Sequence, residues 1–152
     1  MYSKAELANI RKEFWTTFGL YMKPVPSAFG HSRMNWQNYK TGVKDIYFRM
    51  KAEREFVSIG IEITHKDEEL QALFFQQFEQ FRKLLEAETQ EVWDWKLHAS
   101  DDFGQTYSYI QCYQANLNVL NKEHWPAIIS FLKPRIMALD RFWENIKPGF
   151  EE

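Results

Sequence analysis

The stretch FVSIGIEIT, residues 56–64, alternates apolar and other side chains along its length. Its aliphatic residues are every second one: Val57, Ile59, Ile61 and Ile63. A period of two is typical of a strand with one buried face. From Asp67 the apolar spacing changes to that of an amphipathic helix, which we expect to continue as one helix to Glu88. This strand and helix therefore form the centre of the predicted core.

The flanking sequence supplies the other predicted elements. Ser3-Lys4-Ala5-Glu6 has the spacing of a capping box, which predicts a helix ended by the prolines at positions 24 and 26. A last helix should follow Asn121, and Pro134 should kink or divide it near Leu132. Four further strands are expected, at residues 34–39, 45–51, 92–98 and 106–113.

The predicted element order is α-β-β-β-α-β-β-α. Strands with one apolar face must bury that face, and three amphipathic helices are available to cover it. We therefore predict an α+β fold with a largely antiparallel five-stranded sheet packed with three helices. The sequence contains no internal repeat, low-complexity segment or linker, so residues 1–152 are expected to form a single domain.

Composition limits the classes of function. Aromatic residues make up 17% of the 152 residues and give a small domain large side chains to bury. The net charge of −2 counts against general binding to nucleic acids or anionic membranes. One cysteine excludes an internal disulfide, and no apolar run approaches the ~20 residues of a membrane span. We expect a cytoplasmic protein with no membrane partner.

An acidic site is the first candidate for chemistry. Asp45 and Glu62 lie at the ends of neighbouring predicted strands, with Lys66 close by, and two carboxylates can hold Mg²⁺ against a phosphodiester. In the alternative, Glu62 is a solvated strand residue, and Thr64 with Asp67 caps the helix. The alternative is favoured because exposed carboxylates on strands are common. No cofactor is expected, and Mg²⁺ enters only if the protein is a nuclease.

The order helix, three strands, helix, strand resembles the core of the PD-(D/E)xK nuclease superfamily. That resemblance implies Asp45 as the aspartate and Glu62 as the glutamate of the motif. The lysine position is occupied by Thr64, and Lys66 is displaced from it by two residues. The chain therefore lacks the residue most diagnostic of that superfamily.

Histidines and the cysteine give weaker signals. His31, His65, His98 and His124 are scattered, and none forms a pair at the i, i+4 spacing typical of a metal site on a helix. Cys112 lies on a predicted strand without a neighbouring histidine motif, which favours a structural thiol.

Aromatic and basic residues form a third candidate site. Tyr39, Tyr47, Arg49 and Lys51 are predicted to share the polar face of the first three strands, and the strand at 106–113 adds more tyrosines if its Tyr-bearing face is exposed. Such a surface can bind protein or stack on single-stranded bases, or it can form a second core layer. We favour core first, protein interface second and nucleic acid third, because the net charge is negative.

Four stretches together resemble a family of uncharacterised bacterial domains. They are FWTTFGLYMKPVPSA, NWQNYKTGVKDIYFRM, GIEITHKDEELQALFFQQF and HWPAIISFLKPRIMALDRFW. The resemblance implies a domain that occurs alone or as the C-terminal part of larger proteins, some with nuclease-like N-terminal parts. It implies no activity and no catalytic residues.

The sequence leaves the function open. The aromatic excess and the lack of a complete catalytic motif favour a binding module that forms a homo-oligomer or binds another protein. A divergent metal-dependent nuclease and a single-stranded nucleic-acid binder remain as alternatives.

Overall fold

The computed structural model describes residues 2–30 and 34–151. Its elements are α1 (Lys4–Met22), β1 (Ile46–Ala52), β2 (Phe56–Ile63), α2 (Glu68–Glu79), α3 (Arg82–Thr89), β3 (Asp94–Ser100), β4 (Thr106–Ala115) and α4 (Trp125–Ile146), with short 3-10 helices at Lys122–His124 and Lys147–Phe150. The fold is α+β, as predicted. The described residues form four strands and four α-helices, so the predicted five strands and three helices were wrong.

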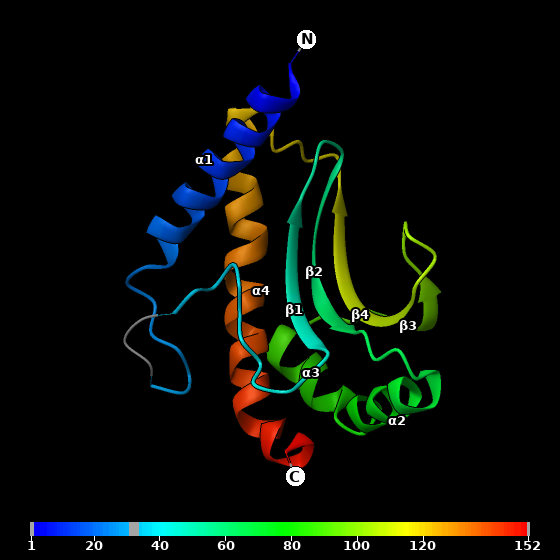
Figure 1. Ribbon diagram of the computed structural model, residues 1–152. Helices are drawn as coiled ribbons and strands as arrows, with labels where there is room; N and C mark the ends of the chain where they lie inside the picture. Colours follow the sequence, from blue (N-terminus) through cyan, green and yellow to red (C-terminus); the bar gives the residue numbers. More distant parts are fainter. Residues whose placement is uncertain (1, 31–33, 152) are drawn as a thin grey trace.

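The four strands form one antiparallel sheet in the order β1-β2-β4-β3. Two hairpins, β1–β2 and β3–β4, meet where β2 pairs with β4, and α2 and α3 connect them. Helices α1 and α4 lie on one side of the sheet, with α2 and α3 at its lower end (Figure 1). The sheet curls away from the helices into a trough, and no helix of the described residues lies inside it.

The core forms on the convex side of the sheet. The predicted aliphatic face of β2, from Val57 to Ile63, is fully buried, which confirms the strand and the face that it buries. Phe14 and Phe18 of α1 and the apolar face of α4 complete this core. The capping box at Ser3 and Glu6 is present, and Asp67 caps α2 by accepting from the amides of Glu69 and Leu70.

Gly60 allows a close approach between β2 and β4. A Cβ atom at this position would lie 2.5 Å from the carbonyl oxygen of Ile110 and 2.8 Å from Cβ of Gln111. The backbone of β4, which pairs with β2 at this point, therefore approaches Gly60 to a distance that only glycine permits.

The strand predicted at residues 34–39 is an irregular loop. The side-chain oxygen of Asn35 accepts the backbone N–H of Asn38 at 3.0 Å and closes a turn. Trp36 and Tyr39, three residues apart, are both buried, which a turn allows and an alternating strand does not.

The helix predicted from Asp67 to Glu88 is divided in two. Phe81 has φ −104° and ψ 14°, outside helical geometry, and its amide bonds the carbonyl of Phe78 three residues back. The two helices pack on different partners, α2 on the sheet and α3 on α4, so one straight helix could not serve both.

Pro134 does not divide the last helix, because α4 runs unbroken from Trp125 to Ile146. The guanidinium of Arg135 donates to the carbonyl of Phe131 at 2.8 Å, in the turn that the proline disturbs. Across residues 2–30 and 34–151, no helix combines the length and the apolar character needed to cross a lipid bilayer.

Candidate functional site

The trough is the concave face of the sheet and carries four of the residues singled out in the sequence, namely Tyr47, Arg49, Lys51 and Glu62. The strand register places the following side chains on this face: Tyr47, Arg49 and Lys51 of β1, Ser58 and Glu62 of β2, Asp94 and Lys96 of β3, and Tyr107, Tyr109, Gln111 and Tyr113 of β4. The sequence left open which face of β4 is buried. Ser108 and Ile110 are fully buried on the convex side, so the tyrosines of β4 face the trough.

An ion cluster occupies the β1–β2 side of the trough. Glu62 accepts from Nε of Arg49 at 2.8 Å, and Nζ of Lys51 lies 3.5 Å from its other oxygen. The Arg49 guanidinium also covers the ring of Tyr47, 4.4 Å from its centre. Two cations therefore share one carboxylate, whose side chain is only 16% exposed, and this leaves a net positive charge beside an aromatic ring.

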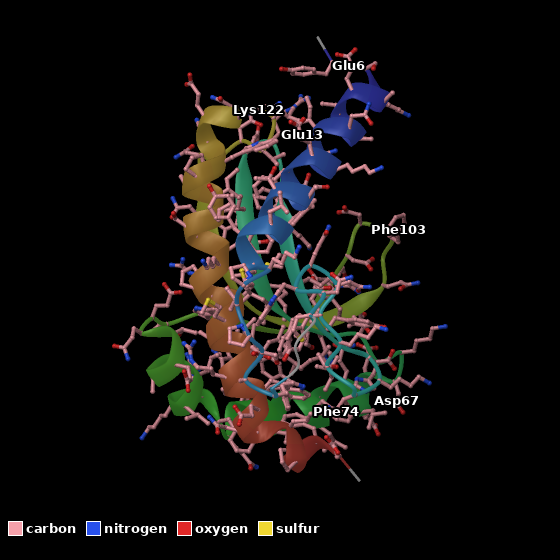
Figure 2. All side chains as sticks on the ribbon, turned by 90° about the vertical axis from the view of Figure 1, so that its left-hand side faces the viewer. Glu6, Glu13, Asp67, Phe74, Phe103 and Lys122 are labelled. Atoms are coloured by element: carbon pink, nitrogen blue, oxygen red, sulfur yellow. The ribbon has the colours of Figure 1, made fainter. Side chains whose placement is uncertain are left out.

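A hollow of about 410 Å³ separates this cluster from the loop between β3 and β4. Asp101 holds that loop, because its carboxylate accepts from the amides of Phe103 and Gln105 at 2.8 and 2.9 Å. Asp102 is exposed and lines the hollow opposite Arg49 and Lys51. Phe103 is 89% exposed at the tip of the loop and projects from the body of the molecule (Figure 2). The hollow thus has a basic wall and an acidic wall.

The trough tyrosines form a partly exposed aromatic strip. The rings of Tyr107 and Tyr109 are 5.7 Å apart, and Tyr113 stacks on Phe56 at 5.2 Å. Burial, and then the negative charges of Glu62 and the two aspartates of the loop, raise the pKa of Tyr107. Its hydroxyl therefore remains protonated at neutral pH and can donate a hydrogen bond.

The residues of the predicted acidic metal site lie near the ends of β1 and β2. Asp45 lies just before β1 with φ 63°, and its backbone carbonyl accepts the amide of Thr64 at 2.9 Å. Glu62 is already paired with two cations, and Lys66 is exposed beyond the end of β2. Within the described residues, no group of three or more histidine, cysteine or acidic side chains could hold a metal ion.

The described histidines each contact different residues. His65 is buried and stacks on Phe74 with ring centres 4.4 Å apart, and its Nδ1 has no hydrogen-bond partner among the described residues. His98 contacts the carbonyl of Glu68, and Nδ1 of His124 accepts the amide of Asn118. His31 lies outside the described residues.

Tyr39 is not on the trough face. It is buried in the core, stacks on Phe48 at 4.8 Å and donates its hydroxyl to Asp140 at 2.5 Å. Burial, reinforced by Asp140, raises the pKa of Tyr39. Asp140 also accepts from Ser27 and from the amide of Ala28, so it ties the loop after α1 to α4.

Two polar groups were missed from the sequence. The first is Asp140, which is only 2% exposed. The sequence could have indicated it, because it is an acidic residue on the apolar face of a predicted helix. The second group is a two-pronged pair between Arg135 and Glu91, with distances of 2.7 and 2.9 Å, which Trp93 supports by donating to Glu91 at 3.0 Å. Burial opposes the charge on Glu91, but the hydrogen bonds of Arg135 and Trp93 outweigh it and lower its pKa.

A family model described as Domain of unknown function (DUF4268) matches residues 10–147. The chain belongs to the DUF4268 family. This confirms the prediction of a domain family without an assigned function. No curated protein and no solved structure matches the chain. The DUF4268 match includes the whole trough, the Arg135–Glu91 pair and the Asp140 network.

Proposed function

We propose that this DUF4268 protein is an interaction module, that the trough is its recognition surface, and that a second copy of the chain is its partner. The observation that carries the proposal is the uncovered aromatic strip on the concave face. Tyr47 is 38% exposed and Tyr113 is 55% exposed, although the helices bury the opposite face of the same sheet.

The residue types of the trough fit a protein partner. Tyrosine and arginine are enriched in protein interfaces, where a ring gives a large contact area and a hydroxyl or guanidinium gives direction. Positive and negative groups are both present, with Arg49, Lys51 and Lys96 on this face along with Glu62, Asp94 and Asp102. A polyanion such as nucleic acid requires an excess of positive charge. A surface of mixed charge favours a protein.

The distribution of charge supports self-association. Lys51 lies on the basic wall of the hollow, and Asp102 lies on the acidic wall. In a two-fold dimer each surface meets its own copy, so if the axis passes through the hollow, a residue on one wall contacts the other wall of the partner. A rotated second copy would thus place the basic wall of one chain against the acidic wall of the other, twice.

Charge reversal with rescue tests this proposal. Sedimentation equilibrium at micromolar concentration should give a dimer for the wild type. Lys51→Glu and Asp102→Lys should each give monomers, because each reversal creates like-charge contacts at both ends of the interface. An equimolar mixture of the two variants should restore dimers. In a mixed dimer the two reversed charges attract each other at one end, and the unchanged Lys51 and Asp102 attract each other at the other end.

Lys12→Glu is the matched control, because Lys12 is an exposed lysine of α1 outside the trough, and this variant should dimerise as the wild type does. Asp101 is left unchanged because its carboxylate holds the loop. A wild type that is strictly monomeric, or a mixture that stays monomeric while both variants are folded, would overturn the proposal. Salt-sensitive binding of a single-stranded oligonucleotide that is lost in Tyr47→Ala and Arg49→Ala would instead favour a nucleic-acid partner.

A further inference from the structure

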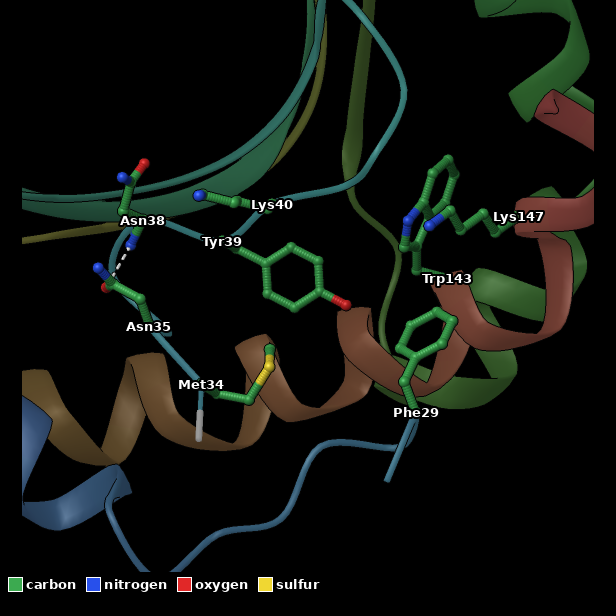
Figure 3. A pocket seen from close by; sticks show the side chains of 8 residues that line it. All are labelled: Phe29, Met34, Asn35, Asn38, Tyr39, Lys40, Trp143 and Lys147. Atoms are coloured by element: carbon green, nitrogen blue, oxygen red, sulfur yellow. Dashed lines mark hydrogen bonds between the residues drawn. The ribbon is translucent and has the colours of Figure 1, made fainter. Parts of the chain in front are cut away.

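A second cavity lies outside the trough, on the other side of the sheet, between the loop at residues 34–40 and the C-terminal part of α4. Its volume is about 320 Å³, at the lower end of the ~300–1,000 Å³ typical of small-molecule sites. Figure 3 shows the rings of Tyr39, Phe29 and Trp143 around it, with Lys40 and Lys147 among the lining side chains. Nothing in the proposed function uses this cavity.

The aromatic floor is rigid and presents carbon surface. The Tyr39 hydroxyl is committed to Asp140 at 2.5 Å, and the indole N–H of Trp143 donates to the carbonyl of Thr41 at 2.9 Å. Trp143 also stacks on Phe78, with ring centres 6.1 Å apart. The polar atoms of both rings are satisfied inside the protein, and Tyr39 is 5% and Trp143 1% exposed. A ligand therefore meets only the small part of each ring that lines the cavity, together with the more exposed ring of Phe29. Such a floor suits a flat ring.

The rim supplies positive charge and hydrogen-bond donors. Nζ of Lys147 lies 5.6 Å from the centre of the Phe29 ring and 3.6 Å from Glu151. Lys40 is exposed and forms no ion pair with any described residue. The carboxamides of Asn35 and Asn38 are exposed on the same rim, and the Asn35 oxygen is held by the amide of Asn38.

The lining contains no carboxylate among the described residues, although Glu151 pairs with Lys147 at 3.6 Å and offsets part of the charge of that lysine. Asp140 lies beneath the floor, where it is 2% exposed and already accepts from Tyr39, Ser27 and Ala28. Two lysines above an aromatic floor select for negative charge on a flat molecule.

We infer that this cavity binds a planar aromatic anion, a molecule with one or two fused rings and a single carboxylate or phosphate group. The ring lies beside Phe29 and over the small exposed part of Tyr39 and Trp143. The anionic group lies at the rim, where Lys40 and Lys147 neutralise it and the asparagine amides donate to it.

A series of naphthalene compounds that share one ring system and differ in charge tests whether binding depends on the charge of the ligand or only on its shape. The probes are 2-naphthoate, 2-naphthyl phosphate, neutral 2-naphthamide and cationic 2-naphthylmethylammonium, each titrated into the full chain by calorimetry and by ¹⁵N-resolved NMR. At least one of the two anions should bind, and the neutral amide should bind about tenfold or more weakly than that anion, because it lacks the ion pair. The cation should not bind. The ratio between carboxylate and phosphate identifies which anionic group the rim prefers.

Variants then place the site. Lys147→Met and Lys40→Met should each weaken the bound anion by about three- to tenfold while leaving the amide unchanged, and the indole N–H signal of Trp143 should shift with the anion. Nζ of Lys147 also packs over Gly42, so Lys147→Met can destabilise the protein. In that case Lys40→Met still tests the inference. Lys83→Met on the exposed surface of α3 is the matched control and should change nothing. Equal affinity for anion, amide and cation, no binding by either anion, or unchanged anion affinity in the folded variants would each overturn the inference.

Discussion

Replacing Gly60 by alanine should destabilise the protein through a clash that no side-chain rotation can relieve. The added Cβ would lie 2.5 Å from the Ile110 carbonyl oxygen, about 0.9 Å inside the 3.4 Å at which ordinary contact begins. Two more atoms, Cβ and Cα of Gln111, would lie at 2.8 and 2.9 Å. Over-packing of this kind costs about 1–3 kcal/mol, or more where the backbone must move. The entropic gain of about 0.4–1 kcal/mol from glycine to alanine offsets part of it. We expect the free energy of unfolding to fall by about 2 kcal/mol.

Urea denaturation followed by far-UV circular dichroism measures this change, and thermal unfolding should show a melting temperature lower by about 4–8 °C. Gly19→Ala is the matched control, because Gly19 lies in α1 and an added Cβ there meets no atom within 4 Å. That variant should gain about 0.5–1 kcal/mol from helix propensity. A Gly60→Ala protein as stable as the wild type would refute the close approach of β4 to β2. If the strands separate to accept the Cβ, the trough flattens and the dimer proposed above should weaken as well.

Two further predictions concern buried and half-buried charge. Glu91→Gln should lower the free energy of unfolding by about 1–2 kcal/mol at pH 7, because Arg135 and Trp93 lose a charged acceptor. The pKa of Glu91 is lowered in the folded state, so its contribution is present above its unfolded pKa of 4.5 and is lost as the pH falls through the folded value. Denaturant titrations should therefore find the two proteins converging in acid, whereas Glu86→Gln in the exposed Arg82–Glu86 pair should cost less than about 0.5 kcal/mol. Burial lowers the pKa of His65 against the attraction of Asp45, and Lys44 adds to the lowering, so protonation favours the unfolded chain as the pH falls below 6.5. His65→Phe keeps a ring against Phe74 and should show a smaller drop in melting temperature between pH 7.5 and 5.5 than the wild type; equal drops would show that His65 is not responsible.

The sequence predicts best where one pattern has one physical meaning. The alternation from Val57 to Ile63 identified β2 and its buried face, because a strand in any other register would expose four aliphatic side chains. The strand at residues 34–39 failed because its alternation was weak and a single hydrogen bond from Asn35 closes a turn there. The break at Phe81 left no trace in the apolar spacing, since the same stripe serves two helices that face different partners.

The candidate site depended on contacts that sequence spacing does not encode. Arg49 and Glu62 are paired through the register of β1 and β2, so their proximity follows once the hairpin is known. The bond from Tyr39 to Asp140 joins residues 101 positions apart, and nothing local to either residue indicates it. The face of β4 was undecided because one side carries tyrosines and the other carries serine, isoleucine and cysteine, and either set can be buried.

The strand order has a consequence for how the chain folds. Each hairpin joins strands that are neighbours in sequence, but the seam between β2 and β4 pairs Phe56 with Ala115 and must wait for the intervening helices to bring them together. Pairings between distant segments form slowly, because closing the long loop costs entropy before any native contact between the two segments stabilises them. Until then both hairpins display an open edge of backbone donors and acceptors, which is the state most exposed to aggregation. We therefore expect the pairing of β2 with β4, at the seam that contains Gly60, to limit the speed of folding.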